Sequence, residues 1–162
     1  MIRVTASSSK KLHGEMELLS KIRECLKKDQ IAIRICKEKG FKEEVLEAVP
    51  IAFDDMEPSA KTIDSYIYLN RKLKKLPFNV LMRYVIHELT HCVQHMLGTN
   101  GSNSKKYLDR EHEIEAFQNQ LEFDATNRGE GKAEEYVEDL LDFHKIKGKE
   151  RDSKKNELLE QV

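Results

Sequence analysis

The longest periodic run of apolar residues lies between Pro77 and Gly98 and predicts a helix. At about 100° per residue, the apolar side chains of this run share one broad sector of the helix. They are Leu81, Met82, Val85, Ile86, Leu89, Cys92, Val93, Met96 and Leu97. Pro77 favours a helix start, Asn79 is a candidate cap, and Gly98 favours a stop. We therefore expect one buried face and a separate polar face.

Apolar residues at helical spacing predict three further helices. These helices are expected at residues 12–26, 107–125 and 133–144. A shorter helix is expected at 41–48, and a polar Gly/Ser/Asn loop at 99–106 connects two of the longer helices. The helical pattern thus covers most of the chain.

Three short runs have the pattern of strands instead. Isoleucine alternates with other residues at 31–36, and β-branched or aromatic residues are dense at 49–53 and 63–69. Turn-forming residues at 54–59 separate the second run from the third. Together with the helices, these runs predict an α+β fold in which a small sheet packs on the helix at 77–98.

Length and composition predict one domain in a reducing compartment. A chain of 162 residues is long enough for one core, which we place at 1–146, and the charged residues 147–162 are expected to form a flexible tail. The three cysteines are widely spaced and predict no disulfide framework. The first residues, MIRVTASSSKK, lack the apolar core of a signal peptide. These features favour a cytoplasmic location.

The charge balance argues against two classes of partner. Charged residues make up 35% of the chain, but the net charge is only −1. A nucleic-acid or membrane-surface protein normally carries a broad basic patch. No apolar run approaches the length that a membrane span requires. We therefore expect neither a membrane nor a nucleic acid as partner, and no particular oligomeric state is predicted.

The polar face of the central helix carries the pentapeptide His87-Glu88-Leu89-Thr90-His91. Residues four apart lie one above the other on a helix, so both imidazoles can reach one metal ion. Glu88 lies about 100° around the helix, where it can take a proton from a water molecule. HExxH on a helix is the pattern of a zinc metallopeptidase, and we therefore expect Zn²⁺.

A third protein ligand is expected from the helix at 107–125, because a catalytic zinc takes three. Glu113 borders the apolar face of that helix, where an unpaired carboxylate would be costly. Glu115 lies about 200° away from Glu113 and His112 about 260° away. Glu113 is therefore favoured, and His112, Glu115 and Glu111 stay open as alternatives.

The sequence resembles a known family at these positions. HExxH followed by a helix with Glu-x-x-Ala, here Glu113 to Ala116, looks like the gluzincin metallopeptidases. The run HELTHCVQH at 87–95 is also similar to small metallopeptidase-like proteins of bacteria and their mobile elements. One position departs from the pattern: many gluzincins have Asp or Asn four residues after the ligand Glu, and this chain has Phe117. The hydrogen-bond partners of the two histidines are therefore unassigned.

The resemblance implies a zincin-like minimal domain that hydrolyses peptide bonds of a protein or peptide substrate. His87, His91 and Glu113 would hold Zn²⁺, and Glu88 would be the general base toward a zinc-activated water. A strand at 63–70 would pair with extended substrate. Four side chains are candidates to contact the oxyanion or the substrate: Tyr107, Arg110, His112 and His95.

Three other functions remain as alternatives. The first is a zinc-binding regulatory or structural protein with little or no proteolytic turnover. The second is an interaction module without a metal. The third is a DNA-linked zinc protease in which His112 is the third ligand, against which the charge balance counts.

Overall fold

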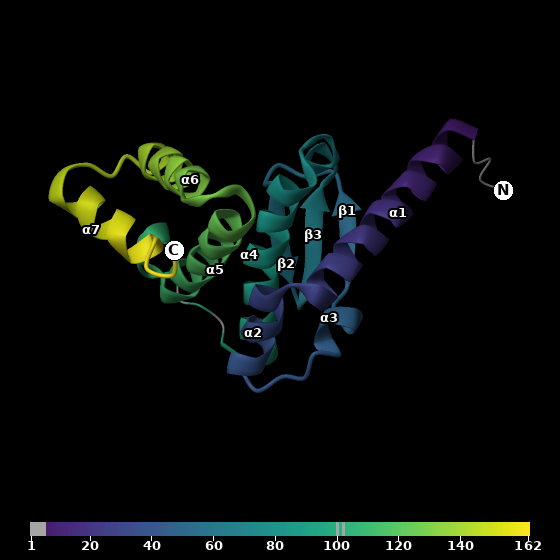
Figure 1. Ribbon diagram of the computed structural model, residues 1–162, viewed down its shortest axis with the longest axis horizontal. Coiled ribbons are helices and arrows are strands. Elements are labelled where there is room, and N and C mark those ends of the chain that lie inside the picture. The colour runs from purple at the N-terminus through teal and green to yellow at the C-terminus, as the bar shows by residue number, and fades with distance from the viewer. Residues whose placement is uncertain (1–5, 100, 102) are drawn as a thin grey trace.

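A three-stranded sheet packs against one long helix in the computed structural model, which describes residues 6–99, 101 and 103–162 (Figure 1). The strands are β1 (Ile51–Asp54), β2 (Ala60–Ile63) and β3 (Tyr66–Asn70). Their order is β1-β3-β2, with β1 parallel and β2 antiparallel to β3. The predicted α+β fold is confirmed. Two predictions fall partly outside the described residues. The N-terminal segment examined for a signal peptide includes residues 1–5, and the predicted loop at 99–106 includes residues 100 and 102.

The predicted single strand at 63–69 is wrong, because a turn divides this region into β2 and β3. Asp64 and Ser65 form the turn with φ angles of 50° and 65°, a left-handed conformation that suits tight hairpins. Ile63 consequently pairs with Tyr66 across the hairpin. β3 is the central strand and already has a neighbour on each side, so it cannot pair with a substrate. The edge strands are β1 and β2.

Helix α4 (Phe78–Met96) is the predicted central helix, and it lies between the sheet and helix α5 (Glu111–Arg128) (Figure 1). Its N-cap residue is Pro77 rather than the predicted Asn79. Gly98 follows the helix with a φ of 74°, a conformation in which a side chain would be strained. The apolar sector is buried against the sheet and the N-terminal helices as far as Val93, whereas Met96 and Leu97 are 39% and 48% exposed. Within the described residues, no helix is both long and apolar enough to cross a membrane.

The predicted strand at 31–36 is wrong, because these residues belong to helix α2 (Gln30–Glu38). Asp29 caps this helix, and its carboxylate accepts a hydrogen bond from the backbone N–H of Ala32 at 2.9 Å. The buried positions 31, 32, 35 and 36 follow the helical period and not the alternation of a strand. Helix α1 (Ala6–Lys28) precedes it as predicted, and the short helix α3 (Val45–Ala48) occupies the second half of the predicted 41–48.

Three helices lie on the other side of α4: α5 (Glu111–Arg128), α6 (Glu130–Phe143) and α7 (Gly148–Leu158) (Figure 1). A second apolar cluster joins them to the short 3-10 turn at 107–109. Two further 3-10 and loop segments, 71–75 and 103–106, connect the elements around α4.

Helix α7 lies in the segment that the sequence predicts to be a flexible tail, so the expected secondary structure of that segment is wrong. Leu158 is fully buried in the second apolar cluster. Lys154 is also buried and donates a hydrogen bond to the carbonyl of Leu108 at 2.8 Å. Helix α7 therefore holds the 107–109 turn, which leads into α5, in place. The division of the chain at residue 146 stays a prediction.

Candidate metal centre

Two histidines of α4 and one glutamate of α5 meet at the interface of these helices. His87 and His91 are only 7% and 8% exposed, and their Nε2 atoms lie 3.2 Å apart. Glu113 places Oε1 3.0 Å from Nε2 of His91 and Oε2 3.4 Å from Nε2 of His87. All three ligand atoms lie within 4.8 Å of one another. This buried trio is able to hold a metal ion.

The hydrogen bonds behind the two imidazoles determine which ring nitrogens face the centre. Nδ1 of His87 lies 2.9 Å from Oε1 of Gln120, and Nδ1 of His91 lies 2.8 Å from Oε1 of Gln94. An amide oxygen only accepts, so each Nδ1 is the donor. Each neutral imidazole then has the lone pair on Nε2, directed at the other histidine and at Glu113. This is the tautomer that a metal ligand needs.

Three electron-pair donors converging in a buried space favour a cation between or near them. Oε2 of Glu113 is buried and has no hydrogen-bond partner among the described residues. An unpaired buried carboxylate oxygen is costly, and a metal ion is the kind of partner that removes this cost. The donor set of two imidazoles and one carboxylate suits Zn²⁺. The residues present therefore fit a metal ion.

The electrostatics of the trio favour positive charge. Burial alone would raise the pKa of Glu113, but the neighbouring imidazoles of His87 and His91 hold it well below its usual range. Burial would lower the pKa of His91, yet the neighbouring Glu113 carboxylate outweighs burial and raises it. Glu113 is thus a carboxylate at neutral pH.

Glu88 lies beside the trio without belonging to it. Its Oε2 accepts a hydrogen bond of 2.5 Å from the hydroxyl of Thr62 on the edge strand β2. Glu88 and the three ligands line one open hollow of about 250 Å³, together with residues of β2. The carboxylate therefore faces the space in which a molecule at the metal centre would lie.

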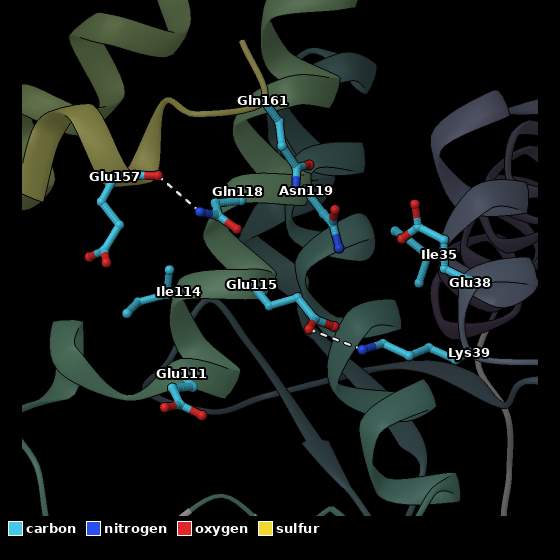
Figure 2. Close-up of a pocket in the computed structure, with 10 residues that line it drawn as sticks. All are labelled: Ile35, Glu38, Lys39, Glu111, Ile114, Glu115, Gln118, Asn119, Glu157 and Gln161. Carbon is cyan, nitrogen blue, oxygen red and sulfur yellow. Dashed lines mark hydrogen bonds and ion pairs between the residues drawn. The ribbon is translucent and has the colours of Figure 1, made fainter.

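The alternative carboxylate ligands lie on the opposite side of α5. Glu111 and Glu115 line a different hollow, between α2, α5 and α7 (Figure 2). There Oε2 of Glu115 lies 3.1 Å from Nζ of Lys39 (Figure 2). His112 lines the hollow at the trio, and its Nε2 lies 3.6 Å from Oε1 of Glu113. Of the four candidates for the third ligand, the geometry brings Glu113 to the two histidines.

Three of the four residues predicted to contact the oxyanion or the substrate line the hollow at the trio, and one does not. Tyr107, His112 and His95 all line the hollow at the trio. Burial and the neighbouring charge of Glu113 raise the pKa of Tyr107, so its hydroxyl stays protonated and can donate a hydrogen bond. Arg110 instead lies over the ring of Tyr107, 5.5 Å from its centroid, and donates to the carbonyl of Lys105.

Two glutamines that the sequence analysis did not single out hold the histidines in place. Gln94 follows His91 by three residues on α4, and its Nε2 also donates to the carbonyl of His112 at 3.0 Å. Gln120 follows Glu113 by seven residues, two turns further along α5. Helical spacing from the ligands was the available signal for both. Phe117 packs edge-on against His87, with ring centroids 4.6 Å apart, and takes no part in these hydrogen bonds.

Comparison with known proteins adds nothing to the geometry of the centre. No protein-family model matches the chain, and neither a curated protein nor a solved structure matches it. The finding that carries forward is a buried His87, His91 and Glu113 cluster with the composition of a metal site.

Proposed function

We propose that this chain is a zinc-dependent metallopeptidase of gluzincin type with a zincin-like fold. The observation that carries the proposal is the convergence of two Nε2 atoms and the Glu113 carboxylate, with Glu88 facing the same hollow. Catalytic zinc sites have three protein ligands and leave a position open. A set of two histidines and one glutamate matches this description.

The nature of the ligands favours zinc over the hard divalent cations. Ca²⁺ and Mg²⁺ prefer six or more oxygen ligands, with water or carboxylate around them. The trio offers two imidazole nitrogens and one carboxylate. Each imidazole is in addition held by a glutamine, as ligand histidines generally are by an outer partner. We therefore assign His87, His91 and Glu113 to Zn²⁺.

Glu88 is the general base of the proposed reaction. Bound zinc would supply a Lewis acid that acidifies a water molecule and polarises a peptide carbonyl. The Glu88 carboxylate accepts the proton of the attacking water and passes it to the leaving amine. The hydroxyl of Thr62 holds one carboxylate oxygen at 2.5 Å and so fixes its direction. A proton acceptor beside an open hollow is what amide hydrolysis needs.

The edge strand and one tyrosine complete the proposed site. β2 borders the hollow with Ala60, Lys61 and Thr62, and its outer edge is free of a partner strand among the described residues. An extended peptide can add to such an edge by backbone hydrogen bonds. The protonated hydroxyl of Tyr107 is the proposed donor to the oxyanion. The substrate is therefore a protein or peptide in extended conformation.

The test uses Glu88→Gln, with Glu115→Gln as the matched control on the other side of α5. Purified variants are loaded with zinc, their metal is quantified, and cleavage of a mixed peptide library is followed by mass spectrometry. Glu88→Gln should keep one zinc and lose roughly 10² to 10⁴-fold in rate, the usual contribution of a general base. Glu115→Gln should keep both zinc and activity.

Two results would contradict the proposal. Full activity of Glu88→Gln would remove the general-base role from Glu88. A zinc-loaded parent chain that cleaves no peptide in the library would favour the alternative function, a zinc-binding regulatory or structural protein.

A further inference from the structure

A second hollow, of about 130 Å³, adjoins the metal centre on the side of α6. We call it the aromatic recess, because four rings from α4, α5, α6 and the 107–109 turn form its walls. These rings belong to Tyr84, Phe117, Tyr136 and Tyr107. His87, Glu88 and Tyr107 line both the recess and the hollow at the trio. A residue beside a bond held at the metal centre would therefore reach the recess.

Gln120 gives the aromatic recess a hydrogen-bond donor without a partner. Its side chain is only 1% exposed, and its Oε1 accepts from Nδ1 of His87. Gln120 lines the recess, and the other end of its amide, Nε2, has no acceptor within hydrogen-bond distance among the described residues. A buried N–H without an acceptor costs free energy, so this position favours a ligand that brings an acceptor atom.

A second donor lies close to this amide. Burial raises the pKa of Tyr136 to about 12, and the attraction between its phenol oxygen and the Gln120 amide N–H, beyond full hydrogen-bond distance, lowers it only in part, so the phenol keeps its proton. An oxygen atom bound between the two residues would receive hydrogen bonds from both. The recess therefore selects for a hydrogen-bond acceptor at its inner end.

The Glu88 carboxylate disfavours an anionic ligand in the recess. Glu88 is the charged side chain that lines it, and Glu113 lies behind His87. The nearby guanidinium of Arg83 already pairs with the buried carboxylate of Asp124 at 3.2 Å. A carboxylate in the recess would be repelled by Glu88, whereas an uncharged carbonyl oxygen is not. The acceptor should therefore be neutral.

Shape narrows the choice to a small planar group. Pockets for whole ligands generally measure about 300 Å³ or more, so a hollow of about 130 Å³ suits one side chain. Ring faces on several sides favour a flat group between them. A carboxamide is flat and neutral, has one strong acceptor, and offers an NH₂ group to the tyrosine oxygens.

We propose that the aromatic recess binds the side-chain carboxamide of a substrate Asn or Gln next to the scissile bond, with Nε2–H of Gln120 donating to its oxygen. The proposal rests on the peptidase function given above and names the substrate class. A site built to hydrogen-bond a ligand rejects an apolar isostere, because the donor is then left unpaired. The discrimination should be roughly tenfold to a hundredfold.

The experiment measures peptide binding without turnover. Capped alanine-based peptides with a single Asn, Gln, Leu or Met are titrated into zinc-loaded Glu88→Gln by calorimetry, and the same peptides are incubated with the parent chain. The Asn and Gln peptides should bind roughly tenfold to a hundredfold more tightly than their Leu and Met isosteres. Equal affinities, tighter binding of the apolar peptides, or no binding of any peptide would overturn the recess proposal. Failure of the peptidase function is distinguishable, because the binding preference would then remain while the parent cleaves none of the peptides.

A pair of variants assigns the preference to Gln120. Gln120→Glu keeps an oxygen for Nδ1 of His87 and removes the N–H donor, so it should retain one zinc and lose the preference for carboxamides. Gln118→Glu makes the same change in the separate hollow of Figure 2, away from the recess and the trio, and should retain both zinc and the preference. A preference that survives in Gln120→Glu would overturn the role of this donor.

Discussion

Replacing Glu113 with Gln should weaken zinc binding at least a hundredfold. The change keeps the size of the side chain and removes the charge of the carboxylate that lies within 3.4 Å of both histidines. Loss of an outer partner of a ligand already costs about tenfold to a hundredfold in metal affinity. Loss of a ligand should exceed that, which corresponds to about 2.7 kcal/mol or more of binding free energy.

The structure supports this magnitude in two ways. Glu113 is 8% exposed, so water does not screen its interaction with a bound cation. Its pKa is also held below the usual range by the two histidines, and the carboxylate is therefore charged throughout the neutral pH range. The whole charge is available to a metal ion.

Glu115→Gln is the matched control, because it makes the same chemical change two residues away. Glu115 is 34% exposed at its side chain and pairs with Lys39 at 3.1 Å in the separate hollow of Figure 2. A surface ion pair contributes about 0–1 kcal/mol to stability, and zinc affinity should not change. Affinities are measured by competition with a fluorescent zinc chelator. Equal weakening in both variants would refute the assignment of Glu113.

Four further outcomes are expected. Gln94→Leu removes the acceptor behind His91, so zinc affinity in the same chelator competition should fall about tenfold to a hundredfold, and an unchanged affinity would contradict the positioning role. Lys154→Met leaves the carbonyl of Leu108 unpaired in a buried position, so denaturant unfolding should show a loss of about 1–3 kcal/mol. Burial raises the pKa of Cys92 to about 12, so thiol reagents at pH 8 should not label it in the native protein. The unfolded thiol loses its proton first, and the contribution of Cys92 to stability should therefore be lost as pH rises from about 9 toward 12, an effect that Cys92→Ala abolishes.

The central helix and the common side of its two histidines could be predicted because the signals are local. Pro77, Gly98 and the apolar period mark the helix, and the spacing of the two histidines fixes their common side. The angular positions of residues around α5 likewise distinguish two glutamates: Glu113 borders the buried apolar face, and Glu115 does not. Such arguments need only the geometry of a single helix.

The errors in predicted secondary structure arose where a short apolar pattern fits both the helical and the strand period. Ile31, Ile33 and Ile35 alternate like a strand, yet Ile31 and Ile35 are also four apart, and the cap at Asp29 decides for the helix. In the hairpin, Asp64 and Ser65 are the turn signal inside an otherwise apolar run. A local cap or turn determined the outcome in these places. For α7, the contact between Leu158 and the second cluster compensates for a sequence of low apolar content.

The partners of the site residues depend on tertiary contacts that the sequence does not specify. Thr62 meets Glu88 only because β2 is the edge strand beside α4. Tyr107 borders the hollow because α7 fastens the 107–109 turn through Lys154. The residues that shape a reaction or a preference thus come from elements far apart in sequence, whereas the ligands come from two helices.

The most direct test of the metal centre is the zinc content of the purified, untagged chain beside the double variant His87→Ala/His91→Ala. His95→Ala/His112→Ala is the matched control, because it removes two histidines that line the same hollow but lie outside the trio. After zinc is added and the excess removed, the parent chain and the control should each hold one equivalent, and the His87/His91 variant should hold none. Zinc in none of the three, or equal zinc in all three, would contradict a metal centre built on His87, His91 and Glu113.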